Sequence, residues 1–215
     1  KIFVVPCYVN TDLFKPHPNK DFNIKCVLNI KNDSKILCYL GSIGGIYLVD
    51  EMLNFFLELR NKNKKYIFLF ITNQKYELKN ILIKEKYKNI KNYIKVLSLD
   101  YKDISKYLNQ VNVCICFKKN SIARLGTFSI KFAEALSLGI PQIYNTNIGD
   151  FDEIFEKNEI GLTIDIHNDK NFYNIIEKIN NLENLNKNKI RQCALDNFSI
   201  KNAKSDYINI YKNLK

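Results

Sequence analysis

Two side chains three residues apart, Lys131 and Glu134, have the chemistry to recognise a ligand that carries both phosphate and sugar hydroxyls. Residues at this spacing share one face of a helix. A carboxylate can accept hydrogen bonds from two neighbouring hydroxyls, and an ammonium group attracts phosphate. The alternative is a surface ion pair, which contributes little energy. The pair therefore indicates either a ligand-binding helix face or a merely solvated one.

More positive charge gathers just before this pair, in the segment KKNSIARLGTFSIKFAE. Its cations are Lys118, Lys119, Arg124 and Lys131. Thr127 or Ser129 could cap the helix that follows. Capping leaves other amide N–H groups free, and the helix dipole adds to their attraction for an anion. Arg124 is thus a second candidate partner for a phosphate.

A glycine-rich stretch, LGSIGGIYLVD, contains Gly41, Gly44 and Gly45 after an apolar run. Glycines let the backbone approach a ligand closely, and a helix following them would offer free N–H groups to a phosphate. The spacing matches neither G-x-G-x-x-G nor the phosphate-binding P-loop. The stretch therefore predicts either a diphosphate-binding turn or a purely structural one.

The elements that must position these residues alternate along the chain. Apolar runs predict strands at 35–41, 66–73, 94–100, 111–117, 140–145 and 161–166. Helical spacing predicts helices at 49–62, 76–89, 101–110, 128–139 and 151–158, and from 169 to the end. Strands that are apolar throughout and alternate with helices indicate a parallel sheet covered on both faces. We expect an α/β, Rossmann-like, doubly wound six-stranded sheet with C-terminal helices, which binds ligands at the carboxyl ends of its strands.

The helix at 128–139 also carries a close-packing face. Its small and apolar residues are Phe132, Ala133, Ala135, Leu136 and Leu138. Gly139 fits a left-handed cap at the end of the helix. The helix is therefore expected to pack tightly while offering its first turns to a ligand.

Composition excludes several other kinds of site. The net charge is +11, but the lysines are dispersed and form no arginine-rich stripe, so we expect no nucleic-acid partner. Six cysteines without C-x-x-C spacing and two histidines argue against a zinc site or a disulfide framework. They are better read as idle thiols in a reducing cytoplasm. No apolar run approaches the roughly 20 residues that span a bilayer.

Several segments together resemble the C-terminal, donor-binding half of the retaining group 1 glycosyltransferases of the GT-B fold. They are VVPCYVNTDLFKP, ILCYLGSIGGIYLVDEML and TFSIKFAEALSLGIPQIYNTNIGDFDEIFEKNEIGLTID. The resemblance implies a linker between two Rossmann domains at 1–34, a nucleotide-sugar-binding domain at 35–200 and a C-terminal helix at 201–215. It also implies that an N-terminal domain is missing from this chain.

By this resemblance, Glu134 matches the glutamate that binds the ribose, and Lys131 matches the lysine of a P-x-K-x-x-E motif. Gly44 and Gly45 match the turn beside the diphosphate, and the loop ending at Gly149 would lie beside the donor. The chain departs from the family's pattern at three positions. They are Gly126, where many members have a sugar-binding glutamate, Ser42, where many have an arginine, and Ser129, where the motif has a proline.

The function implied is binding of a nucleoside-diphosphate sugar and, with the missing domain, transfer of a hexose with retention to an acceptor. The fragment alone should be inactive, no metal or cofactor is expected, and no catalytic residue is assigned. Polysaccharide or membrane-surface acceptors, and a cytoplasmic location that includes the inner face of the membrane, are the expectations for this class. Two alternatives stay open: a nucleotide-sugar epimerase of the same fold, and a degenerate Rossmann module that only mediates interactions.

Overall fold

The computed structural model describes residues 3, 5–17, 21–121 and 128–213. Its strands are β1 (Lys35–Leu40), β2 (Tyr66–Ile71), β3 (Ile94–Leu97), β4 (Val113–Cys116), β5 (Gln142–Asn145) and β6 (Gly161–Ile164). Its helices up to β5 are α1 (Ile24–Val27), α2 (Val49–Lys62), α3 (Lys75–Ile81), α4 (Tyr101–Leu108) and α6 (Ile130–Ser137). Then follow α7 (Phe151–Lys157), α8 (Asp169–Leu182), α9 (Lys187–Phe198) and α10 (Ile200–Asn213).

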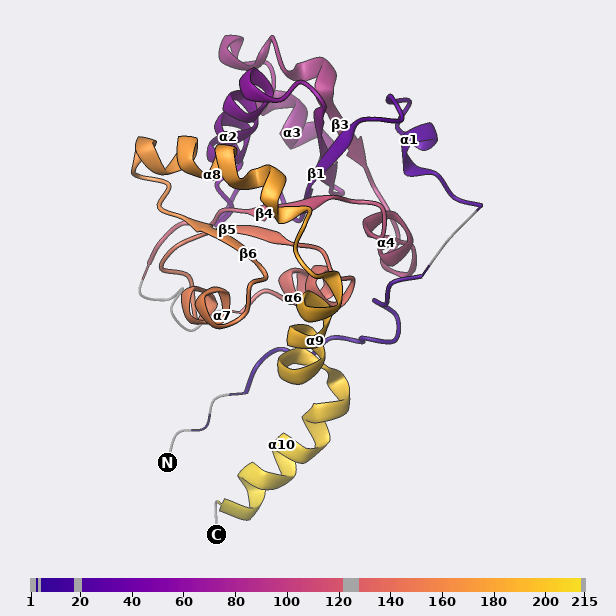
Figure 1. Ribbon diagram of the computed structural model, residues 1–215, viewed down its shortest axis with the longest axis vertical. Coiled ribbons are helices and arrows are strands. Elements are labelled where there is room, and N and C mark those ends of the chain that lie inside the picture. The colour runs from indigo at the N-terminus through magenta and orange to yellow at the C-terminus, as the bar shows by residue number, and fades with distance from the viewer. Residues whose placement is uncertain (1–2, 4, 18–20, 122–127, 214–215) are drawn as a thin grey trace.

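All strands belong to one parallel sheet in the order β3-β2-β1-β4-β5-β6 (Figure 1). The chain builds outward from β1 in one direction, then crosses to β4 and continues in the other. This reversal of direction defines a doubly wound fold, and it places a ligand site outside the carboxyl ends of the strands. The predicted fold class is confirmed.

Alternate strand residues face opposite layers of helices, as the two-residue period of a strand requires. Leu37 and Tyr39 of β1 belong to a core shared with α2 and α8, whereas Ile36 and Cys38 belong to a core shared with α1 and α4. A third cluster joins β5 to α6, α7 and α9. In Figure 1, α10 extends away from the sheet, and none of its residues is buried.

The predicted helix at 76–89 is wrong in its second half. Helix α3 ends at Ile81, and two 3₁₀ turns follow, η1 (Glu85–Tyr87) and η2 (Lys91–Tyr93). The ring of Tyr87 is fully buried, and its hydroxyl donates to the Asp50 carboxylate at 2.8 Å. This contact with α2, 37 residues earlier in the chain, overrides the local helical pattern.

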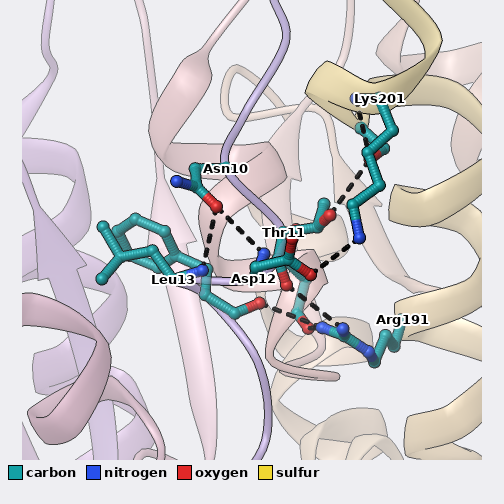
Figure 2. A network of polar contacts seen from close by, with 9 residues as sticks. Asn10, Thr11, Asp12, Leu13, Arg191 and Lys201 are labelled. Atoms are coloured by element: carbon teal, nitrogen blue, oxygen red, sulfur yellow. Dashed lines mark hydrogen bonds and ion pairs between the residues drawn. The ribbon is translucent and has the colours of Figure 1, made fainter.

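Residues 9–14, which belong to the segment predicted to be a linker, lie against α9 and α10 (Figure 2). The Arg191 guanidinium donates to the carbonyl oxygens of Phe14 at 3.0 Å and Thr11 at 3.2 Å. Lys201 pairs with Asp12 at 2.9 Å. Two backbone hydrogen bonds join Val9 to Phe198 and Ile200. We call these bonds, together with the Arg191 and Lys201 contacts, the clasp.

Within the described residues, no helix combines the length and apolar character that crossing a membrane requires. The longest helices have 14 residues each and carry charged side chains. Helix α10 in particular presents lysines along its length.

Candidate functional site

A cavity of about 280 Å³ opens at the carboxyl edge of the sheet, where the topology predicts a ligand. The ends of β1 and β2 and the loops after them form most of its wall, and α4 and α6 contribute Ile104 and Lys131. The other lining residues are Leu40, Gly41, Ser42, Ile71, Thr72, Asn73, Gln74 and Leu99. The wall is therefore mixed, with apolar side chains beside amide, hydroxyl and ammonium groups.

The glycine turn adopts the open conformation that its sequence favours. Gly44 and Gly45 have φ angles of +84° and +65°, and apart from adjacent residues of the chain no atom lies within 4 Å of where a Cβ would be. The turn is fixed at its start, because the Ile43 amide donates to the Gln74 side chain at 2.7 Å. Ser42 is exposed, and its carbonyl accepts from the Tyr39 hydroxyl at 2.7 Å.

The glycine turn does not lead directly into a helix N-terminus. Helix α2 begins only at Val49, and its first turn carries Asp50 and Glu51. These carboxylates already complement the positive end of the helix dipole. A phosphate at this turn would thus be held by loop amides and neighbouring cations rather than by the start of α2.

Two of the predicted cations come together around one aromatic ring. The ammonium groups of Lys131 and Lys118 lie 5.4 Å and 6.0 Å from the centroid of Tyr47. Lys118 is only 3% exposed, and its backbone is fixed by the Asn145 side chain, which accepts from its amide at 2.8 Å and donates to its carbonyl at 3.0 Å. Lys119 points outward as an exposed residue. Arg124, Gly126 and Thr127 lie outside the described residues.

Glu134 is not part of a surface ion pair with Lys131. Its side chain is 2% exposed, and no ion pair within 4 Å joins it to that lysine. Burial raises the pKa of the Glu134 carboxyl, while a hydrogen bond from the Tyr101 hydroxyl and the charge of Lys131 partly oppose this rise. In return, burial and the neighbouring carboxylate raise the pKa of Tyr101 to about 12. The carboxylate therefore interacts with Tyr101, and Glu134 does not belong to the lining of the cavity.

Ser129 occupies the N-cap position of α6, but its side chain forms no capping hydrogen bond. The hydroxyl instead bonds to that of Tyr144 in the core, so the expected capping role is wrong for this residue. The other end of α6 matches the prediction. Gly139 follows the helix with a φ angle of +72°, and an added Cβ would lie 2.7 Å from the Lys187 carbonyl oxygen.

The loop after β5 is a tight turn. Asn147 and Gly149 both have positive φ angles, +62° and +53°. The Asn147 amide donates to the Asp152 carboxylate at 2.8 Å, and Ile148 between them is fully buried. Gly149 is thus held at the carboxyl edge of β5, but it does not line the cavity at β1 and β2.

Of the predicted site residues, the structure brings Ser42 and Lys131 into one cavity. The sequence reading missed the loop after β2, Thr72 to Gln74, and also Tyr101. A signal for the loop was available, since the polar letters TNQ follow a strand of six buried residues, YIFLFI. Nothing local distinguished Tyr101, because its contact with Glu134 depends on how α4 and α6 pack.

Among the described residues, no group of three or more His, Cys, Asp or Glu side chains is placed to hold a metal ion. The cysteines of β1 and β4, Cys38 and Cys114, are buried neighbours in the sheet. Burial, as the largest cause, raises the pKa of the Cys38 thiol well above its ordinary value.

Comparison with known proteins gives the fold its context. The chain is similar to a glycosyltransferase from Rickettsia africae, with 17% identity and a TM-score of 0.80 over 99% of this chain and 57% of that one. It is similar to sucrose-phosphate synthase from Thermosynechococcus elongatus, with 17% identity and a TM-score of 0.72 over 99% of this chain and 52% of that one. HepE from Anabaena, solved in complex with UDP-glucose, gives 12% identity and a TM-score of 0.71 over 96% of this chain and 55% of that one.

The chain thus spans just over half the length of the solved structures that it resembles. No sequence among the curated proteins matches it. Residues 20–194 match the family described as "Glycosyl transferases group 1", and this segment covers most of the 215 residues. The chain therefore belongs to the group 1 glycosyl transferases.

Proposed function

We propose that this chain is the donor-binding domain of a glycosyltransferase and holds a nucleoside-diphosphate sugar at the carboxyl edge of its sheet. The observation that carries the proposal is the cavity shared by Lys131, the start of the glycine turn and the polar loop after β2. It lies where a doubly wound sheet binds its ligand. The family match and the UDP-glucose complex of HepE support the same class of ligand.

In this proposal Lys131 faces the diphosphate. The half-buried side chain of Lys131 lies in the cavity wall, and its ammonium group lies near the Tyr47 ring. The ammonium group of Lys118 lies near the same ring and adds a second positive charge. The open glycines let backbone amides approach the phosphate oxygens. Stabilising the departing diphosphate by fixed positive charge is an effective way to lower the barrier of glycosyl transfer.

Glu134 is the proposed partner of the ribose hydroxyls. Because the Tyr101 hydroxyl already bonds to this carboxylate, the ribose must displace it or bind beside it. Tyr101 is 55% exposed, so its ring can move if it gives up its contact with Phe14, whose ring centroid lies 5.6 Å away. The base would then lie towards Leu99 and Ile104, which belong to the apolar part of the wall.

Transfer of the glycosyl group, with retention and to a polysaccharide or membrane-surface acceptor, is proposed for the full-length protein. Its active site would form between this domain and a second one, which would bind the acceptor. No catalytic residue is assigned within this chain. A non-catalytic module of the same fold is the second candidate, and the burial of Glu134 at 2% exposure is the observation that favours it.

The test is a calorimetric titration of the chain with UDP, GDP and ADP. We expect saturable binding of one of them. In Lys131→Gln the affinity should fall about tenfold, because a hydrogen bond to a charged group contributes about 1.5–3 kcal/mol and this one is partly solvated. Lys204→Gln, which removes an exposed lysine on α10, is the matched control for net charge.

Binding of none of the three nucleotides would refute the donor-binding role and favour the non-catalytic module. Equal losses in Lys131→Gln and Lys204→Gln would show that the charge of the whole chain, rather than the cavity, attracts the ligand.

A further inference from the structure

A second and larger hollow, of about 440 Å³, opens at the opposite edge of the sheet. Ser34 immediately precedes β1, and Ile67 and Lys95 are the second residues of β2 and β3, so the hollow lies at the amino ends of these strands. The segment after α1, the end of α2 with the loop that follows it, and the turn η2 complete its wall. It is therefore distinct from the donor cavity, which lies at the carboxyl ends of the same strands.

Cationic side chains line the hollow, and no carboxylate of the described residues belongs to its wall. Lys31, Arg60, Lys64 and Lys95 belong to its wall, and no Asp or Glu does. A nearby carboxylate, Asp33, is engaged with Lys65 at 3.7 Å, and neither residue lines the hollow. Four positive charges around one concavity give a local field that attracts anions.

Arg60 distinguishes this hollow from an ordinary surface of solvent-exposed lysines. Its side chain belongs to the buried class, at 7% exposure, and its Nη1 donates to the carbonyl oxygens of Lys64 and, at 3.1 Å, Tyr66. Its guanidinium carbon lies 3.6 Å from the centroid of the Tyr93 ring. The remaining N–H groups make no hydrogen bond with the described residues, and no carboxylate among those residues pairs with it.

The N–H groups of Arg60 that make no hydrogen bond are not fully buried, so they remain accessible to a ligand. The Tyr93 ring stacks on the guanidinium and fixes its position. A guanidinium with unused N–H groups can bind phosphate through two parallel hydrogen bonds. The hollow is thus better suited to a phosphate than to a neutral ligand.

The rest of the wall is partly apolar. Ile30, Ile67 and the Tyr93 ring lie in it beside the amides of Asn29 and Asn92. We propose that this hollow binds a small phosphorylated organic molecule, with the phosphate on Arg60 and the lysines and the carbon skeleton on the apolar wall. This proposal does not depend on the donor site, because the two cavities share no residue.

The test follows backbone amide chemical shifts of the whole chain during titration with glycerol 3-phosphate and, separately, inorganic phosphate. We expect saturable shifts around Asn29, Lys31 and Asn92, with weaker binding of inorganic phosphate because it has no carbon skeleton to cover. Lys31→Gln/Lys95→Gln should lower the affinity for glycerol 3-phosphate about tenfold. Arg60 itself is kept, since its substitution would also remove two hydrogen bonds to the backbone.

The matched control is Lys204→Gln/Lys212→Gln, which removes two exposed lysines of α10 and leaves the affinity unchanged if the hollow is the site. Equal losses in both double variants, shifts confined to the carboxyl edge of the sheet, or no saturable shift would each overturn the proposal. Equal affinity for glycerol 3-phosphate and inorganic phosphate would refute the proposed contact between a carbon skeleton and the apolar wall. The hollow would then be a simple anion site.

Discussion

Glu134→Gln should make the protein more stable and a poorer nucleotide binder at the same time. The carboxyl group is 2% exposed, and burial is the largest cause that raises its pKa above that of an ordinary glutamate. The folded state therefore favours the protonated form. The stability that this contributes is complete below the ordinary glutamate pKa and is lost as the pH rises through the raised value.

The size of the expected change in stability follows from which interactions of Glu134 a glutamine retains and which it loses. Its amide oxygen can still accept from the Tyr101 hydroxyl, so the hydrogen bond is retained, while the cost of burying a charge disappears. The lost attraction to Lys131 offsets part of the gain. We expect a net gain on the order of 1 kcal/mol at pH 8, which for a chain of 215 residues raises Tm by about 2–4 °C.

Thermal unfolding at pH 8 and at pH 4 is the assay, with Glu156→Gln on the exposed face of α7 as the control. The gain should shrink at pH 4, where the wild-type carboxyl is already protonated. In parallel, affinity for the nucleotide should fall about tenfold, because an amide replaces a charged acceptor for the ribose hydroxyls. A variant that is less stable than wild type by the same amount at both pH values would refute the reasoning, because Glu134 would then be a stabilising buried group.

Three further changes test other parts of the structure. Tyr101→Phe removes the hydroxyl that occupies Glu134, so calorimetry should show nucleotide binding about fivefold tighter; weaker binding would mean that the hydroxyl helps to hold the ligand. Gly139→Ala forces a side chain into a left-handed conformation against the Lys187 carbonyl and should cost about 2 kcal/mol or more in urea unfolding; an unchanged midpoint would contradict this. Arg191→Met removes hydrogen bonds to three backbone carbonyls of two segments, and it should speed amide exchange in residues 9–14 while the sheet stays protected; uniform loss of protection would show that the clasp is inseparable from the core.

Much of the architecture was predictable because each strand reads as a continuous apolar run. Burial on both faces makes such runs unambiguous, and the helical spacing of Met52, Phe55, Phe56 and Leu59 likewise placed four fully buried residues on α2. Gly139 was also predictable, since few other residues accept its backbone conformation. A local sequence pattern predicts the structure where a single physical requirement, such as burial on both faces of a sheet or a left-handed backbone conformation, limits which residues can occur.

The site was less predictable because its contacts join segments far apart in the chain. In sequence, Glu134 fits either a ligand-binding carboxylate or a surface ion pair, but the packing of α4 and α6 brings Tyr101 against it. The Ser129 hydroxyl turned to Tyr144 rather than to its own helix for the same kind of reason. Helix α3 ended early because Tyr87 bonds to Asp50 on α2. In each case a tertiary partner overrode a local preference.

The clasp has a mechanical consequence. Val9 and Ser199 run parallel, and the Val9 backbone bonds to Phe198 and Ile200, so the chain enters and leaves the domain at one place. A pull between the two ends drives parallel segments past each other and loads these bonds together with the Arg191 and Lys201 contacts in shear. The sheet lies outside this line of force. Tension would thus be borne at the clasp, and the strands and the cavity at their carboxyl ends would feel it only after the clasp had broken.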